Sequence, residues 1–128
     1  MKEFYILAII IMLSSPSKHG AKTDESNAHI AIVELNGEIA DSKDANADDI
    51  ISGLTDAFEA KNSKAVVLRI NSPGGSPVQS GYVYDAIRQL RTKYPDKKLY
   101  AVITDIGASG AYYIAAAADQ IYVSPASL

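Results

Sequence analysis

Short apolar runs alternate with helical patterns along most of this chain, and this alternation restricts the fold more than any other feature of the sequence. Runs rich in β-branched residues have the length and composition of buried strands over residues 30–35, 65–70, 99–103 and 121–123. Between them, apolar residues recur at three- and four-residue intervals over 47–60 and 76–94, and an alanine-rich stretch reaches 118. Such alternation is typical of right-handed βαβ units. The sequence therefore predicts an α/β fold built on a parallel sheet.

Capping residues place the starts of two helices. Asn46 is the expected N-cap of the first helix. For the second, Ser76 precedes Pro77 and stands three residues before Gln79, which combines a serine N-cap, a proline at the first helical position and a capping-box glutamine. The predicted apolar face of this second helix contains Tyr82, Val83, Ala86, Ile87 and Leu90.

The first 28 residues have the pattern of a targeting segment. An apolar run over 4–13 is followed by a polar stretch over 14–20, which is typical of a secretory signal. Ten helical residues span only about 15 Å, roughly half the hydrocarbon thickness of a bilayer, so a free-standing span is disfavoured. We expect 1–28 to be a signal peptide or short membrane anchor with a linker, and 29–128 to form the exported domain at the cell membrane.

Composition excludes several classes of function. The net charge is −3, and no basic block is longer than the pair Lys97-Lys98, so no nucleic-acid footprint is present. The absence of cysteine removes disulfides, thiolate metal sites and a cysteine nucleophile. His19 and His29 are too far apart in sequence to form a local metal pair and are interpreted as solvated residues. No cofactor or metal is expected.

Two glycine-rich loops follow predicted strands, over 71–75 and 105–110. In parallel sheets, functional sites lie beyond the carboxyl ends of strands, so both loops are expected to face one cleft. Ser109 stands at the start of a helix, where free N–H groups and the helix dipole lie close to its hydroxyl. A serine in this position can act as a nucleophile, and the N–H groups of Gly75 and Gly110 can form an oxyanion hole.

Simpler interpretations of the same residues are common. A serine at a helix start is usually a cap, and the run Pro73-Gly74-Gly75 is usually a turn. Their joint occurrence after alternating strands favours a site. Tyr112 and Tyr113 are interpreted as core residues rather than as walls of a cleft, because aromatic residues early in a helix are more often buried.

Two longer motifs make a family resemblance specific. The segments 68–75 and 105–119 closely resemble the matching segments of bacterial signal peptide peptidase A and its SohB relatives. The resemblance implies the ClpP/crotonase fold, here incomplete at its carboxyl end. It implies cleavage of residual signal peptides in or at the membrane by a Ser/Lys dyad, with peptide substrates and a homo-oligomeric assembly. It places the nucleophile at Ser109 and an oxyanion donor at Gly75.

The chain departs from that pattern in two ways. The family's catalytic lysine lies beyond the end of this sequence, and Ala111 replaces a glycine found in many relatives. The lysines near the motifs are expected to be solvated surface charges: Lys61, Lys64, Lys93, Lys97 and Lys98. Three alternatives therefore stay open: an inactive fragment or scaffold, a crotonase-fold acyl-CoA hydratase or isomerase that does not use Ser109, and an α/β-hydrolase, whose Gly-x-Ser-x-Gly elbow fails at Ala111.

Overall fold

A computed structural model describes residues 27–128, and within them four parallel strands form one sheet in the order β1-β2-β3-β4. The strands are β1 (His29–Asn36), β2 (Ser63–Ser72), β3 (Lys98–Gly107) and β4 (Gln120–Val123). The helices are α2 (Ala47–Glu59), α3 (Pro77–Lys93) and α4 (Gly110–Ala115). The predicted parallel α/β architecture is confirmed. The expectation for the targeting segment falls almost entirely on residues outside those described.

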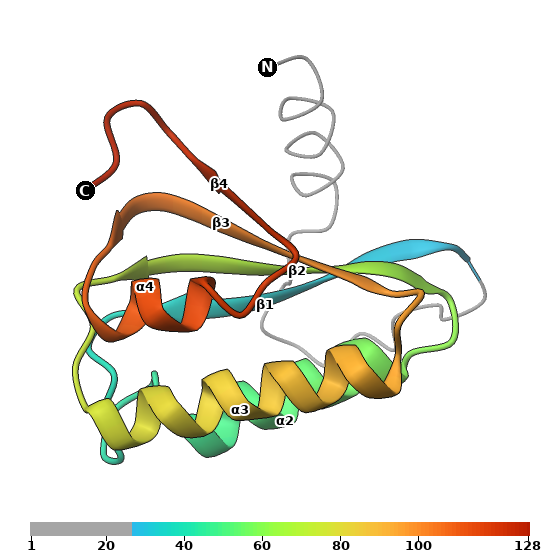
Figure 1. The fold of residues 1–128 in the computed structure, drawn as a ribbon, viewed down its shortest axis with the longest axis horizontal. Helices are drawn as coiled ribbons and strands as arrows, with labels where there is room; N and C mark the ends of the chain where they lie inside the picture. The colour runs from blue at the N-terminus through green and yellow to red at the C-terminus, as the bar shows by residue number, and fades with distance from the viewer. Residues whose placement is uncertain (1–26) are drawn as a thin grey trace.

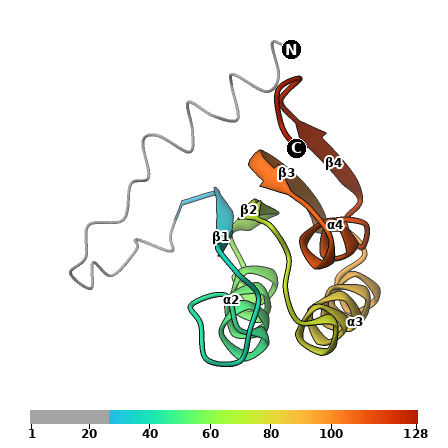
Figure 2. The ribbon, with the colours of Figure 1, turned by 90° about the vertical axis from the view of Figure 1, so that its left-hand side faces the viewer.

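Helices α2 and α3 lie side by side against one face of the sheet (Figures 1 and 2). Alternate residues of β2 point to that face, and three of them, Val66, Leu68 and Ile70, are fully buried in the main core. Leu54 and Ile87 supply matching apolar positions from α2 and α3. The carboxyl ends of β2 and β3 lie together at the left of Figure 1, where α4 begins. This edge of the sheet carries both glycine-rich loops.

Both predicted helix caps are present, and one capping residue has a different partner. The Asn46 side chain accepts a hydrogen bond from Asp49 N–H at 2.9 Å, and Ser76 Oγ accepts one from Gln79 N–H at 3.3 Å. The Gln79 side chain does not complete a capping box, because its Oε1 accepts from Ala47 N–H at 2.7 Å. Gln79 therefore ties the start of α3 to the start of α2, a role that only the tertiary structure defines.

Three local predictions are wrong. Tyr82 is 56% exposed and is not part of the apolar face of α3. Strand β3 continues to Gly107, into the predicted loop, because Ser72 pairs with Gly107 and Leu128 exchanges backbone hydrogen bonds with Asp105 and Gly107. Helix α4 ends at Ala115 rather than near 118, because the following turn tightens to hydrogen bonds between residues three apart.

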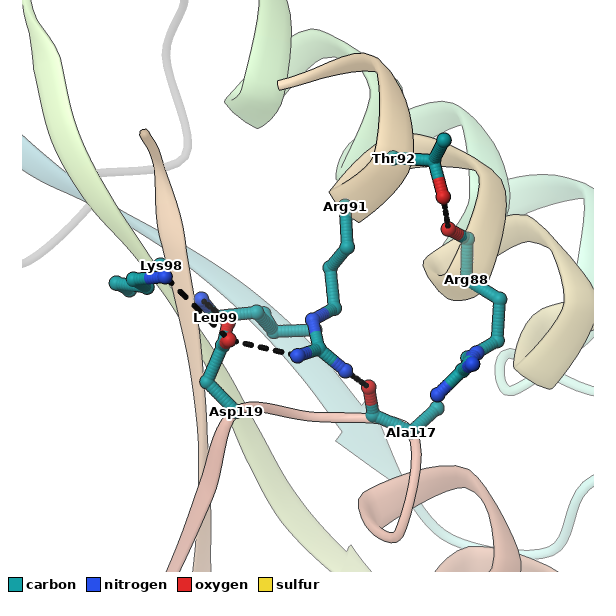
Figure 3. Close-up of polar contacts among 7 residues, drawn as sticks. All are labelled: Arg88, Arg91, Thr92, Lys98, Leu99, Ala117 and Asp119. Carbon is teal, nitrogen blue, oxygen red and sulfur yellow. Dashed lines mark hydrogen bonds and ion pairs between the residues drawn. The ribbon is translucent and has the colours of Figure 1, made fainter. Parts of the chain in front are cut away.

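A polar clamp ends the α4 segment and joins it to α3 and β3 (Figure 3). The Asp119 carboxylate accepts hydrogen bonds from Leu99 N–H at 2.8 Å and from the Arg91 guanidinium at 2.7 Å. Arg91 also donates to the carbonyl of Ala117 at 2.7 Å. Lys98 Nζ lies 3.9 Å from the same carboxylate. Because β4 starts directly after Asp119, this clamp fixes where the last strand of the sheet begins.

The clamp predicts a loss of stability in acid. Burial alone raises the pKa of Asp119, but the Leu99 N–H, Arg91 and Lys98 outweigh it, so its pKa lies below the ordinary 3.8. A lowered pKa means that the stabilisation is complete well above pH 3.8 and is lost as the pH falls through the folded-state pKa. We expect Asp119→Asn to cost about 1–3 kcal/mol at pH 7 and progressively less as the pH falls through the folded-state pKa, measured by urea unfolding.

The control for this measurement is Asp85→Asn, which changes an exposed carboxylate on α3. It is expected to change the free energy of unfolding by less than about 0.5 kcal/mol. An Asp119→Asn deficit that keeps its size throughout an acid titration in which the wild-type protein stays folded and Asp119 becomes protonated would contradict the electrostatic account of the clamp.

Candidate active site

The two glycine-rich loops lie against each other at the carboxyl edge of the sheet. Ala108 N–H donates to the carbonyl of Ser72 at 3.1 Å, which joins the second loop to the end of β2. Gly74 packs so closely on the second loop that an added Cβ would lie 2.8 Å from Ser109 Cβ and from Gly110 N. The predicted approach of the two loops is therefore confirmed, and Gly74 must be a glycine for the contact to form.

Ser109 has a backbone conformation that an ordinary capping residue does not adopt. Its φ is 52° and its ψ is −125°, and it is the only non-glycine residue with positive φ in the described part of the chain. Its side chain makes no capping hydrogen bond to α4. Such a conformation costs on the order of 1–3 kcal/mol and persists only where the surrounding structure enforces it. A strained serine between a strand and a helix is the geometry of an exposed nucleophile, as in the elbow of the α/β-hydrolases.

The backbone of Ser109 gives a prediction that stability can test. Ser109→Gly removes the Cβ that disfavours positive φ and is expected to raise the free energy of unfolding by about 1 kcal/mol, after the added flexibility of the unfolded chain is counted. Ser109→Ala keeps the Cβ and serves as the control, with a stability within about 0.5 kcal/mol of wild type. Thermal unfolding of the three proteins measures this. A glycine variant less stable than the alanine variant would show that the turn is not strained.

The N–H groups of Gly75 and Gly110 have no hydrogen-bond acceptor among residues 27–128. They belong to neighbouring walls, since a Cβ added at Gly110 would lie 3.7 Å from Gly75 N. The same added Cβ would overlap Ser80 Oγ, and one added at Gly75 would overlap the carbonyl oxygen of Ile39. Gly75 thus requires glycine, whereas a side chain at Gly110 would have to displace the Ser80 hydroxyl; each position leaves a free donor beside Ser109. Two such donors are what a developing oxyanion requires.

A cleft of about 310 Å³ opens at this point, and its lining is mainly apolar. The residues that line it are Gly75, Pro77, Ser80, Gly81, Ser109, Gly110 and Tyr113. Tyr113 is half exposed and stacks on Tyr84 with ring centroids 4.5 Å apart, and Tyr112 is 55% exposed. The interpretation of Tyr112 and Tyr113 as core residues is therefore wrong. One of them, Tyr113, forms a wall of the cleft.

Ser80 is a residue of this cleft that the sequence interpretation missed. Its side chain is buried, and its hydroxyl donates to the carbonyl of Ser76 at 2.8 Å. The available signal was its position on α3, three residues before Val83 and seven before Ile87, which places a polar residue on the buried face of the helix.

Comparison with known proteins agrees with this geometry. Residues 91–128, which include Ser109, Gly110 and the clamp, match the model of Peptidase family S49. The chain is 32% identical over 107 residues to a putative signal peptide peptidase SppA from Enterococcus faecium, covering 77% of this chain and 30% of that protein. Over these residues the chain is similar to the S49 peptidases. The predicted resemblance to signal peptide peptidase A is confirmed.

Two further likenesses concern the fold and a differently named protein. The structure is similar to a mutant of ClpP1 from Listeria monocytogenes, with a TM-score of 0.56 and 26% identity over 69% of this chain and 46% of that one. The ClpP-like fold is thus confirmed. The chain is also 45% identical over 75 residues to a Brucella abortus protein named Na(+)/H(+) antiporter NhaA. The matched segment makes up 10% of that protein. The chain spans a tenth to a third of these sequence relatives.

The S49 resemblance implies a general-base lysine, and no lysine or histidine lines the cleft as the structure describes it. Lys97 has one property of such a base, because burial lowers its pKa and Lys64 lowers it further. It lies at the wrong end of the sheet, however. Strand β3 runs for ten residues between this end and Gly107, about 30 Å at 3.3 Å per residue.

Lys97 also has a structural role, so its interpretation as a solvated charge is wrong. Its Nζ donates to the carbonyls of Phe58 and Ala60 at 2.7 and 2.8 Å. These are carbonyls at the end of α2, where an ammonium group satisfies free acceptors and interacts favourably with the helix dipole. Lys97 is therefore not placed to act as a base beside Ser109.

Within residues 27–128, none of the helices has the length and apolar character needed to cross a bilayer. The same residues hold no cluster of three or more acidic, histidine or cysteine side chains able to bind a metal ion.

Proposed function

We propose that this chain supplies the nucleophile and oxyanion hole of a serine endopeptidase. The observation that carries the proposal is the strained, uncapped Ser109 beside two N–H groups that have no acceptor in the described residues. A cap or a simple turn requires neither the strain nor the two free donors. An acyl-CoA hydratase or isomerase shares the two-loop oxyanion hole but does not use a serine at this position.

The proposed reaction is acyl transfer by a Ser/Lys dyad. Ser109 Oγ attacks the scissile carbonyl carbon while its proton passes to a neutral lysine amine, which lies outside this sequence. The negative oxygen of the tetrahedral intermediate accepts hydrogen bonds from Gly75 and Gly110 N–H. The C–N bond then breaks, and the lysine returns the proton to the leaving amine. Water, deprotonated by the same lysine, then attacks the acyl carbon; the ester bond to Ser109 Oγ breaks, and the lysine returns the proton to Oγ.

Residual signal peptides at the membrane are the proposed substrates. The cleft that holds Ser109 is lined mainly by apolar atoms, which suits the apolar segments of such peptides. The Enterococcus relative is named as a signal peptide peptidase. The apolar run at residues 4–13 gives a means of export or attachment, with 29–128 as part of the peptidase domain on the exported side. The proposed peptidase assembles as a homo-oligomer.

The test uses the intact protein encoded by the reading frame that contains this chain. It is incubated in phospholipid vesicles with a synthetic signal peptide, and the products are followed by mass spectrometry. Cleavage within the apolar part of the peptide is the expected result. The 128-residue chain by itself is expected to be inactive, because the lysine is absent from its cleft.

Failure has a clear form in this experiment. An intact protein that leaves every signal peptide uncut but cleaves a soluble unfolded protein would overturn the substrate proposal alone. Hydration of an unsaturated acyl-CoA thioester, with no peptide cleavage, would overturn the peptidase proposal in favour of the crotonase alternative.

A further inference from the structure

Ser72 contacts both loops of the candidate active site. It is the last residue of β2, and its side chain is fully buried. Its Oγ accepts a hydrogen bond from Gly74 N–H at 3.1 Å, and its carbonyl accepts one from Ala108 N–H at 3.1 Å. One residue therefore holds the start of the loop that carries Gly75 and the residue that precedes Ser109.

The hydroxyl of Ser72 fixes the Pro73–Gly74 peptide, which directly precedes the peptide that carries the Gly75 N–H. Gly74 and Gly75 have φ values of 93° and 154°, a region open mainly to glycine. Gly74 is held at its N–H by Ser72 and at its carbonyl by Ile39 N–H, at 2.9 Å. The carbonyl of Gly74 and the N–H of Gly75 belong to one trans peptide and point in opposite directions. Holding Gly74 at both groups thus aims Gly75 N–H away from Ile39.

The direction of the Gly75 N–H decides whether Gly75 and Gly110 can both donate hydrogen bonds to the same oxyanion. Gly74 also packs directly on Ser109 and Gly110, so a small rotation at Gly74 changes the separation between the Gly75 and Gly110 donors. Oxyanion donors act only when both lie within about 3 Å of the same developing charge.

We propose that the Ser72 hydroxyl is a positioning group for the oxyanion hole, acting on Gly75 N–H through Gly74. The inference rests on the proposed peptidase function of Ser109. Ser72 does not touch the substrate. Its removal leaves Gly74 N–H without an acceptor and takes away one of the two hydrogen bonds that fix the backbone angles of Gly74, which set the direction of the Gly75 N–H. The effect is expected in the transition state, where the oxyanion forms, rather than in substrate binding.

The experiment compares four variants of the intact protein. Ser72→Ala deletes the hydroxyl. Ser72→Thr and Ser72→Val have nearly the same shape, and only Thr retains the hydroxyl, so their comparison cancels the cost of the added methyl group. Ser63→Ala is the matched control: Ser63 is the first residue of β2, is buried, and bonds to the carbonyl of Ala65 at 3.0 Å. Each variant is assayed for kcat, KM, inhibition by a peptide aldehyde, and thermal stability.

Ser72→Ala and Ser72→Val are expected to lower kcat by about 10- to 100-fold with KM nearly unchanged, and to weaken aldehyde inhibition by a similar factor. Ser72→Thr is expected to exceed Ser72→Val in kcat by about tenfold. Ser63→Ala is expected to lower stability and leave kcat unchanged.

Equal kcat values for the Thr and Val variants would overturn the inference, as would a fall confined to KM. If Ser72→Ala does not fold, the Thr and Val pair decides. The proposed function fails separately, if Ser109→Ala cleaves as fast as wild type. Dependence on Ser109 without dependence on the Ser72 hydroxyl defeats only the positioning role.

Discussion

Ser109→Ala in the intact protein is expected to lower kcat by about 10⁴-fold or more, because removing a serine nucleophile leaves only the oxyanion hole and substrate binding. KM is expected to change little, since the hydroxyl contributes to bond formation rather than to recognition of the peptide. The measurement is steady-state cleavage of a fluorogenic peptide, with burst kinetics to detect the acyl-serine. The alanine variant keeps the backbone strain of the turn, so a loss of activity cannot be attributed to a relaxed loop.

Thr104→Ala is a suitable control for this comparison. Thr104 lies near the end of β3, outside the cleft lining, and its hydroxyl donates to the carbonyl of Ile70 at 3.3 Å. Its replacement removes a hydroxyl from the same strand and loop unit and is expected to leave kcat within about threefold of wild type. A Ser109→Ala variant as active as Thr104→Ala would remove Ser109 from the mechanism.

Gly75→Ala is expected to have the largest effect on stability of any single methyl addition at the site. At φ of 154°, the new Cβ would overlap the backbone of Ile39, which is buried and cannot withdraw. The strained φ and the forced displacement together cost about 3 kcal/mol or more. For a domain of this size the melting temperature is expected to fall by roughly 10 °C or more. Whatever folded protein remains would have a displaced Gly75 N–H and a kcat about 10²–10³-fold lower.

Gly37→Ala separates the destabilisation caused by the positive φ from the destabilisation caused by the overlap with Ile39. Gly37 has a φ of 82°, and an added Cβ there would meet nothing within 4 Å. Gly37→Ala is therefore expected to lower the free energy of unfolding by about 1–2 kcal/mol, through the backbone conformation alone, and to leave the kinetics unchanged. If Gly75→Ala and Gly37→Ala were equally stable, the close approach of Ile39 to Gly75 would have no energetic importance.

Much of the fold was determined by the sequence itself, because the decisive signals are local. β-branched runs predicted all four strands, and the caps at Asn46 and Ser76 placed the starts of α2 and α3 correctly. The parallel arrangement followed from the alternation of strands and helices, and with it the meeting of two loops at one edge of the sheet. The motif around Ser109 also predicted the family likeness. These features depend on hydrogen bonds and side-chain periods within short segments.

Only the tertiary structure decided which residues line the cleft and which residues lie elsewhere with other partners. The positive φ of Ser109, the wall formed by Tyr113 and the buried Ser80 depend on contacts between segments far apart in sequence. Lys97 and Gln79 found distant partners that no local pattern specifies. The physical reason is common to all of them. A backbone angle or a buried hydroxyl is set by the atoms that surround it, and those atoms come from strands and helices that meet only when the chain folds.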